Sequence, residues 1–401
     1  MSGASESDPH GGSPRRPRAR DLGIWIGSDE PGPLNSITDV PGVRVGHTTL
    51  ISGDGPLRVG FGPVRTGVTV VVPCDHVGRS LLFAGCHRLN GNGELTGLEW
   101  IRESGLLTSP VAITNTHSVG SVRDALVQAE IKARSEGGTF WSLPVVGETC
   151  DATLNDMNGF HVRAEHALAA LDRASGWPVQ EGNVGGGTGM ICHGFKGGIG
   201  TASRVVSKTA GGYTVGVLVQ ANHGRRERLS VAGVPVGREI PVSEVPLPSS
   251  RAGAPRQTGA GSIIAVVATD APLLPHQCRR LAQRAGLGVA RSGGVGENTS
   301  GDLFVAFATG NIGPAWTTRP EPEHPARTAN IVMLSDRFIS PLFDAVVDST
   351  EEAIVNALLA AETMTGRDGV TAYALPHDRL LRVMEKYARP GEESEPTART
   401  T

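Results

Sequence analysis

The sequence lacks several features that define whole classes of protein. It contains no run of 18 apolar residues, so it predicts no membrane-spanning helix, and its leader "MSGASESDPHGGSPRRPRARDLG" has no apolar segment typical of a secretory signal. Its five cysteines are odd in number and widely scattered, which favours thiols in a reducing cytoplasm over a disulfide framework. The net charge of −3 provides no basic field for nucleic acid. We therefore expect a cytoplasmic protein with neither a membrane nor a nucleic acid as partner.

Glycine (54 residues) and proline (27 residues) are abundant and predict many turns and close backbone approaches. Residues 1–33, rich in Gly, Ser, Pro and Arg, predict a disordered leader, and residues 391–401 predict a disordered tail. Between them strand and helix signals alternate, which predicts an α/β protein. The predicted strands are 67–73, 111–115, 142–146, 213–220, 262–269, 302–309 and 329–334. The predicted helices are 121–134, 272–290 and 349–366, the last opening with a capping box of Ser349 and Glu352.

The segment 241–261, "PVSEVPLPSSRAGAPRQTGAG", interrupts this pattern. It is rich in proline and has no hydrophobic periodicity, so it predicts an exposed, mobile loop. The loop ends at Gly261, and Ser262 begins the apolar run "SIIAVVAT" of a buried strand. Taken on its own short context, such a serine is most simply an ordinary strand start.

Cleavage of the bond before Ser262 would change the chemistry of that serine. Ser262 would then carry a hydroxyl and an α-amine, and an α-amine has a pKa of about 7.7–8.0. Such an amine can accept the hydroxyl proton without a separate histidine. The small Gly261 leaves room for the Ser262 hydroxyl to attack the preceding carbonyl in an N→O acyl shift. The local sequence therefore permits an N-terminal serine nucleophile.

Six longer stretches together resemble one family. They are "NSITDVPGVRVGHTTL" (35–50), "NGNGELTGLEWIRESG" (90–105), "LPVVGETCDATLNDMNGFHV" (143–162), "EGNVGGGTGMICHGFKGGIGTASR" (181–204), "VGVLVQANHG" (215–224) and "GSIIAVVATDAPLLPHQ" (261–277). The stretches are similar to those of the DmpA-type peptidases, which include L-aminopeptidase/D-esterase and the β-peptidyl aminopeptidases. The likeness runs in order from about Asn35 to about Met384, nearly the whole of the predicted folded chain.

This resemblance implies a four-layer αββα sandwich, similar to N-terminal nucleophile hydrolases but with different connectivity. It also implies a precursor that cuts itself, here between Gly261 and Ser262, and that needs no cofactor. Residues 34–261 would form the α-piece and residues 262–390 the β-piece of a single catalytic domain. The cleaved heterodimers would then assemble into a homo-oligomer.

The resemblance also implies the residues of the site. Ser262 would be the nucleophile, and Ser300 and Asp302 would lie near its new amine, as the Ser-x-acid pair of "NTSGDLF". Asn222 would stabilise the oxyanion, for which an amide N–H donor is suited. Glu148 would receive the free amino group of the substrate by a charge-assisted hydrogen bond.

Two further positions are assigned to the substrate pocket. The family often has a tyrosine after "ET", where its hydroxyl lies near the oxyanion, but this chain has Cys150. A thiol is shorter and a weaker donor than a phenol, so either Asn222 and backbone N–H groups suffice or the substrate range differs. Trp141 is predicted to wall the pocket, and a role in the core is an equal alternative.

Other motifs do not support a cofactor. "GNVGGGTGM" has neither the Lys-Ser/Thr of a phosphate loop nor the third glycine of a dinucleotide fingerprint, because Met190 stands in that place. The pairs "CDH" (74–76), "CH" (86–87) and "CH" (192–193) lack zinc-ligand spacing, and adjacent residues on a strand face opposite sides. No G-x-S-x-G elbow is present. We therefore predict no metal.

The sequence thus predicts a self-processing serine aminopeptidase, amidase and esterase that acts on short peptides, amides or esters with a free amino group. Three alternatives stay open. One is an acyltransferase similar to the ornithine acetyltransferases, which normally cut before a threonine. The second is a processed but inactive binding protein, suggested by Cys150. The third is a metallo-aminopeptidase, which would contain zinc and lose activity in a chelator.

Overall fold

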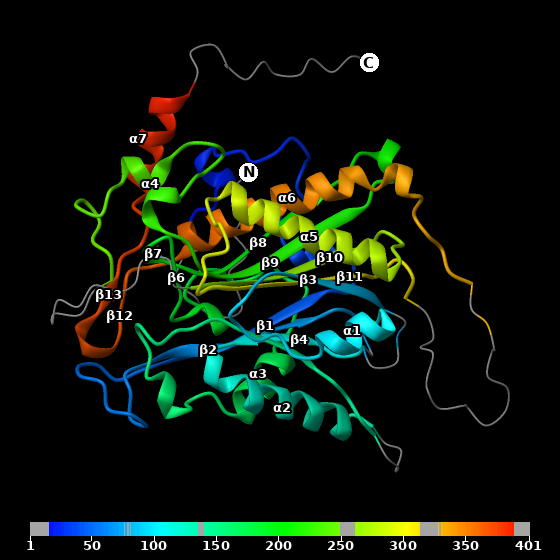
Figure 1. The fold of residues 1–401 in the computed structure, drawn as a ribbon, viewed down its shortest axis with the longest axis horizontal. Coiled ribbons are helices and arrows are strands. Elements are labelled where there is room, and N and C mark those ends of the chain that lie inside the picture. The colour runs from blue at the N-terminus through cyan, green and yellow to red at the C-terminus, as the bar shows by residue number, and fades with distance from the viewer. Residues whose placement is uncertain are drawn as a thin grey trace, which may run out of the picture.

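Two stacked β-sheets, each covered on its outer face by helices, form the body of the protein (Figure 1). The computed structural model describes residues 16–75, 77, 80, 82–134, 140–248, 261–312, 328 and 330–388. The first sheet has the strand order β1 (Arg44–Ser52), β2 (Val64–Val72), β4 (Val111–Thr114), β5 (Val145–Glu148). The second has the order β3 (Phe83–Gly91), β11 (Gly301–Ala308), β10 (Ser262–Thr269), β9 (Thr214–Asn222), β8 (Gly198–Val205).

The helices complete the outer layers. Helices α2 (Val119–Lys132) and α3 (Ala164–Asp172) pack on the four-stranded sheet, and α5 (Pro275–Arg291) and α6 (Ser340–Ala360) pack on the five-stranded sheet. Smaller elements lie around this body: α1 (Leu98–Ser104), α4 (Val236–Glu239), α7 (His377–Tyr387), the hairpin β6 (Ile191–Cys192) and β7 (Phe195–Lys196), and the hairpin β12 (Met364–Thr365) and β13 (Thr371–Ala372). The order helix, sheet, sheet, helix is the αββα sandwich that the sequence predicts. Among the described residues no helix is both long and apolar enough to span a bilayer.

Strand β10 shows why its sequence is a continuous apolar run. All eight of its residues are buried. Ile263, Ala265 and Val267 belong to the core that α5 and α6 cover, whereas Ile264 and Val266 belong to the core between the two sheets. Because successive side chains of a strand point to opposite faces, a strand in the middle of four layers must be apolar on both.

The pairing of β10 brings several strand ends together. It runs antiparallel to β9 and parallel to β11, and β11 is antiparallel to β3. The beginnings of β10 and β11 therefore lie beside the ends of β9 and β3, and Ser262 is paired directly with Asn222. This edge of the five-stranded sheet gathers residues that are far apart in the sequence.

Three local predictions are wrong. Residues 16–33 are not a disordered leader, because Ala19, Ile24 and Ile26 are buried in the core beneath α6, while residues 1–15 and 391–401 lie outside the described chain. Residues 330–334 form no strand, since this apolar run is largely exposed and pairs with no neighbouring strand of the described chain. Helix α6 begins at Ser340 rather than at residue 349, so the Ser349–Glu352 pair lies buried inside the helix and caps nothing.

Glu352 instead joins α6 to segments that precede residue 261. Its carboxylate accepts hydrogen bonds from Arg204 of β8 at 2.5 Å and from the Asn35 side-chain amide at 2.5 Å, and it pairs with Arg20 at 3.3 Å. The side chains of Arg204 and Glu352 are both completely buried. This network therefore links the residues on either side of the Gly261–Ser262 bond.

We expect the Glu352→Ala variant to lose about 3–5 kcal/mol of unfolding free energy, because it leaves the buried Arg204 guanidinium without its counter-ion. Urea denaturation measures the loss. The control is Glu99→Ala, which breaks an exposed pair with Arg102 on α1 and should cost less than about 1 kcal/mol. Equal losses in the two variants would show that the buried network contributes no more than a surface pair.

Candidate active site

Ser262 lies at the edge where the strand ends meet. It is 6 % exposed, and its Oγ accepts a hydrogen bond of 2.9 Å from the Gly301 N–H at the start of β11. Its position alternates with Ile263, so its side chain shares the face of Ile264, which contacts the other sheet at Gly147 of β5. The hydroxyl therefore lies on the face of β10 that is turned toward the other sheet.

The peptide bond before Ser262 lies tightly against the end of β9. A β-carbon on Gly261 would be 2.0 Å from the carbonyl oxygen of Asn222 and 3.3 Å from the Cα of His223. Any residue other than glycine at 261 would have to displace that backbone. The close packing explains why a glycine precedes the serine.

Ser300 and Asp302 lie beside the backbone of Ser262. The Ser300 hydroxyl donates to Asp302 Oδ2 at 2.7 Å, and the Asp302 carboxyl also accepts the Ile263 N–H. Burial raises the pKa of the Asp302 carboxyl to about 6, although these two hydrogen bonds oppose the shift. Asn90, at the end of β3, donates from Nδ2 to the carbonyl of Ser300 at 2.8 Å and so holds this turn in place. An acid that ionises near neutral pH thus lies one residue from the predicted amine.

The side chain of Asn222 is held at both ends. Its Oδ1 accepts the Ile191 N–H at 2.8 Å, and its Nδ2 donates to the carbonyl oxygen of Cys150 at 3.1 Å. Cys150 therefore orients Asn222 through its backbone, and its Sγ lies 3.9 Å from the Met157 sulfur. The amide plane of Asn222 is fixed beside Ser262, with only one of its two Nδ2 hydrogens bonded to Cys150.

Glu148, the last residue of β5, brings a carboxylate from the other sheet. It is 3 % exposed, its Oε1 accepts the Glu94 N–H at 3.0 Å, and its Oε2 accepts the Thr116 hydroxyl. Burial raises the pKa of Glu148 above its ordinary value. A β-carbon on Gly93 would lie 3.0 Å from both Glu148 Oε1 and Gly301 Cα. The carboxylate and the backbone that binds Ser262 Oγ therefore face each other across Gly93.

Trp141 is placed differently from the other predicted residues. Its ring is 53 % exposed and makes an edge-to-face contact with Trp100 of α1, at 5.2 Å between centroids. It lies four residues before the first residue of β5, whereas Glu148 is the last residue of that strand. Among the described contacts none joins Trp141 to Ser262, and its role in substrate binding stays a prediction.

Sequence reasoning missed the residues that hold the site together: Asn90, Gly93, Thr116 and Gly301. Asn90 and Gly93 stand in the motif "NGNGEL", where the resemblance covers them but assigns no role. A glycine required by close approach of two other segments has no local signal, because the need for it arises only when β3, β5 and β11 meet.

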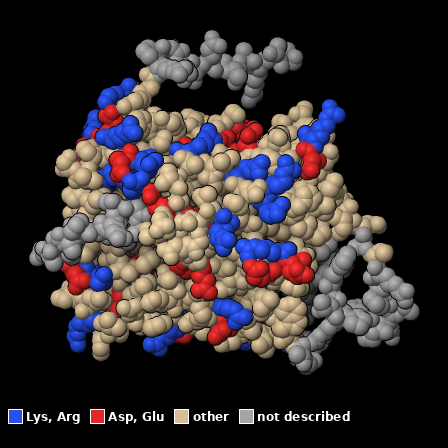
Figure 2. Space-filling model, in the orientation of Figure 1, with Lys and Arg blue, Asp and Glu red and all other residues tan. Residues whose placement is uncertain are grey.

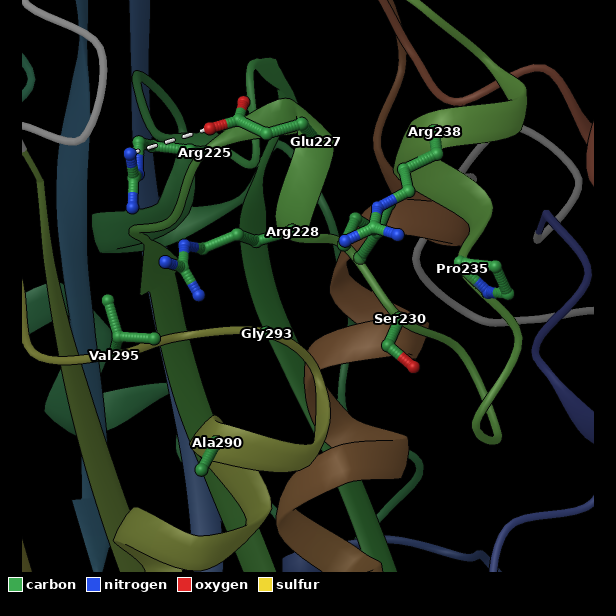
Figure 3. Close-up of a pocket in the computed structure, with 10 residues that line it drawn as sticks. Arg225, Glu227, Arg228, Ser230, Pro235, Arg238, Ala290, Gly293 and Val295 are labelled. Carbon is green, nitrogen blue, oxygen red and sulfur yellow. Dashed lines mark ion pairs between the residues drawn. The ribbon is translucent and has the colours of Figure 1, made fainter.

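A pocket adjoins the predicted site without containing it. This recess of about 450 Å³ lies between the end of α5, helix α4 and the turn at residues 226–228, with Arg225, Arg228 and Arg238 in its wall (Figure 3). Arg225 pairs with Glu297 at 2.8 Å, and the Glu297 carbonyl oxygen lies 2.8 Å from Ser300 Oγ. None of the predicted catalytic residues lines it. On the face of the molecule in Figure 2, basic and acidic side chains are interspersed.

Asp151, next to Cys150, is a completely buried acid behind the site. Burial raises the pKa of its carboxyl from 3.8 to about 7. The folded protein therefore keeps this proton at pH values where the unfolded chain has lost it. The corresponding stability is present below about pH 4 and is lost as the pH rises through about 7.

We expect the Asp151→Asn variant to lose less stability than the wild type when the pH rises from 4.5 to 8, because asparagine cannot ionise. Moving this pKa from 3.8 to about 7 corresponds to about 4 kcal/mol, which is the upper size of the difference between the two pH profiles. Urea midpoints at the two pH values measure it. Asp124→Asn, at an exposed position on α2, should keep the wild-type profile. Parallel profiles for wild type and Asp151→Asn would contradict the expectation.

The αββα sandwich and a buried serine at the head of a central strand define a hydrolase of the Ntn class. Peptidase family S58 matches the chain over residues 35–372, and the protein belongs to that family. It is a peptidase with aminopeptidase function, as the sequence predicts, and the resemblance to DmpA-type enzymes is confirmed.

Named relatives and solved structures agree with this assignment. The chain is 49 % identical over 378 residues to β-peptidyl aminopeptidase BapA of Sphingosinicella microcystinivorans, with 93 % of each chain covered. It is 53 % identical to a β-aminopeptidase of Burkholderia sp., with a TM-score of 0.84 over 93 % of this chain and 100 % of the other. It is 44 % identical to the L-aminopeptidase D-Ala-esterase/amidase of Ochrobactrum anthropi, with a TM-score of 0.81 over 93 % and 99 % of the two chains. That structure is described as a prototype of the serine aminopeptidases and a variant of the Ntn hydrolase fold.

Proposed function

We propose that the protein cuts itself between Gly261 and Ser262 and then acts as an aminopeptidase through an acyl-enzyme on Ser262. The observation that carries the proposal is the setting of Ser262. It is the first residue of β10, its Oγ is fixed by the Gly301 N–H, it is paired with Asn222, and only glycine fits before it.

In the cleaved enzyme the residues take separate roles. The Ser262 amine accepts the hydroxyl proton as Oγ attacks the substrate carbonyl. The ionised Asp302 and the Ser300 hydroxyl stabilise the resulting ammonium group, which lies one residue from the Ile263 N–H that Asp302 already binds. Asn222 Nδ2 donates to the oxyanion, a contact typically worth about 10²–10³ in rate. The leaving amine takes the proton, and water then hydrolyses the ester on Oγ.

Glu148 selects the substrate. Its buried carboxylate favours a ligand that brings a positive charge, such as the ammonium group of an N-terminal residue. We therefore propose short peptides, amides and esters with a free amino group as substrates. The names of the relatives extend the candidates to β-peptides and to D-alanine esters and amides. We also propose a homo-oligomer of cleaved heterodimers in the cytoplasm, the second point supported by the five thiols, which form no disulfide.

The test is the intact mass of the purified protein, with N-terminal sequencing of any smaller piece. A fragment that begins Ser-Ile-Ile-Ala is expected, followed by hydrolysis of a panel of aminoacyl p-nitroanilides and amides that includes β-residues. A single uncut chain, stable over days at neutral pH, would refute the proposed nucleophile. Clean cleavage without hydrolysis of any member of the panel would refute the catalytic function but not the processing.

A further inference from the structure

Cys192, His193 and His223 form a buried cluster behind the Gly261–Ser262 bond. One possible ligand atom from each residue lies within 4.8 Å of the other two, and all three residues are buried. His193 and His223 meet edge to face with 5.1 Å between ring centroids, and Cys192 Sγ lies 3.8 Å from His223 Nδ1. The site proposed above uses none of these side chains.

The turn between β6 and β7 makes this cluster possible. Cys192 and His193 would face opposite sides if both stood on one strand. Strand β6 ends at Cys192, and His193 adopts a left-handed conformation with φ of 50° in the turn that follows. That conformation turns both side chains toward His223, which directly follows β9.

The hydrogen bond of His193 leaves one of its ring nitrogens as an acceptor. His193 Nδ1 lies 3.0 Å from the Arg225 carbonyl oxygen, which can only accept, so Nδ1 carries the proton and Nε2 keeps its lone pair. Among the described residues neither His193 Nε2 nor His223 Nε2 has a hydrogen-bond partner, although both atoms are buried. A backbone carbonyl that fixes the tautomer of an imidazole is the usual partner of a metal-binding histidine.

We propose that Cys192, His193 and His223 bind one soft metal ion through a thiolate and two neutral imidazoles. Binding displaces the thiol proton of Cys192, which passes to solvent, and forms one metal–sulfur and two metal–nitrogen bonds. The ion supplies the missing partner of His193 Nε2. It also ties the turn after β6 to the end of β9, one residue from Asn222.

The surroundings of the cluster favour Cu⁺ over Zn²⁺. Buried Lys196 donates to the Met190 and Gly197 carbonyls at 2.9 and 2.8 Å, and Arg226 donates to the His193 carbonyl at 3.0 Å. With the Arg226 guanidinium this near, the neutral pair of Cu⁺ and a thiolate costs less than a pair that keeps a positive charge. Structural Zn²⁺ sites also normally have four ligands, whereas the described residues supply three.

The ion has a structural role in this arrangement. A β-carbon on Gly261 would lie 3.3 Å from the Cα of His223, so the backbone that the ion fixes is the surface against which the Gly261–Ser262 bond packs. Binding is independent of the Ser262 hydroxyl, and the inference goes beyond the proposed function without requiring it.

The test measures metal bound per chain. Full-length protein is incubated without oxygen in Cu⁺ held by a competing chelator, or in Zn²⁺, then desalted and analysed for metal. The wild type and Cys278→Ser are expected to keep about one equivalent, and Cys192→Ser and His193→Gln less than about a tenth of one. Cys278 is the matched control because it is an equally buried thiol outside the cluster. The Ser262→Ala chain should bind like the wild type, which separates this test from that of the catalytic proposal.

A second measurement needs no variant. Wild-type protein titrated with Cu⁺ without oxygen should develop a thiolate-to-copper charge-transfer band in the ultraviolet that saturates at about one equivalent, which tests the site even where Cys192→Ser fails to fold. Binding of either Cu⁺ or Zn²⁺ that depends on Cys192 supports the site, and the ion retained identifies its occupant. Binding of neither ion, or equal binding by Cys192→Ser, would overturn the proposal.

Discussion

The Ser262→Ala variant is expected to stay a single chain of 401 residues and to lose aminopeptidase activity by about 10⁴–10⁶-fold. Alanine removes the hydroxyl that attacks the Gly261 carbonyl, so neither the ester intermediate nor the new amine can form. The substitution deletes one buried oxygen whose only described hydrogen bond is from the Gly301 N–H, so the fold should persist. Intact mass and hydrolysis of an aminoacyl p-nitroanilide measure the two effects.

A second serine provides the control for this variant. Ser292, at the end of α5, is also buried, and its hydroxyl donates to the Val289 carbonyl at 2.9 Å. The Ser292→Ala variant should be cut and active like the wild type. Processing of Ser262→Ala at the same bond would show that another group is the nucleophile, and an inactive Ser292→Ala would show that loss of any buried serine hydroxyl disturbs the enzyme.

Much of the fold can be predicted because the central strands of four layers must be apolar on both faces. The predicted strand 262–269 has the same first and last residues as β10. The predicted strand 302–309 differs from β11 by one residue at each end. Strands β1, β3 and β8 escape prediction because they mix polar and small residues. β3 has the sequence "FAGCHRLNG" and leaves the core at His87, and Gly200 of β8 is required by α6 packing close above it.

Helix α6 illustrates a different failure. "STEE" has the spacing of a capping box, but the helix already starts nine residues earlier, at Ser340 beside a proline in its first turn. In the sequence alone, a buried acid within a helix cannot be told from the acid of a capping box, because its hydrogen-bond partners are unknown. The partners of Glu352 are more than a hundred positions away along the chain. The cluster of Cys192, His193 and His223 could not be predicted for a similar reason. The residue pair "CH" does not indicate that His193 adopts a left-handed turn conformation.

The structure brings most of the predicted site residues close together, but not all of them. Ser262, Asn222, Ser300 and Asp302 meet at one sheet edge because their strands pair in one register, and Glu148 reaches them from the second sheet across Gly93. Their chemical roles stay proposals that the variants test. Cys150 is assigned to the substrate pocket by the sequence, and that role stays a prediction. Its described link to the site is its carbonyl oxygen, which accepts a hydrogen bond from Asn222 Nδ2.

The Glu148→Gln variant is expected to lose about 10²–10³-fold in kcat/KM for substrates with a free amino group, while self-cleavage proceeds as in the wild type. Glutamine keeps the shape: its Oε1 can still accept the Glu94 N–H, and its Nε2 can donate to the Thr116 hydroxyl oxygen, but it removes the negative charge that pairs with the substrate ammonium. Loss of one partner of a buried, hydrogen-bonded charge pair typically costs about 2–5 kcal/mol. The Gly261–Ser262 bond carries no ammonium group before it is cut, so processing does not need this charge.

Three comparisons separate loss of the Glu148 charge from other effects of the substitution. An ester that lacks the amino group should be hydrolysed equally slowly by wild type and variant, because it never uses Glu148. The wild type should lose kcat/KM as the pH falls through the pKa of Glu148, which burial raises, and the variant should lack that part of the decline while keeping the part due to Asp302 near pH 6. Glu99→Gln on α1, an exposed acid, should leave kcat/KM within about threefold. A Glu148→Gln enzyme with normal kcat/KM for aminoacyl substrates would place the amine-binding group elsewhere, and an uncut Glu148→Gln chain would show that this carboxylate also serves the processing step.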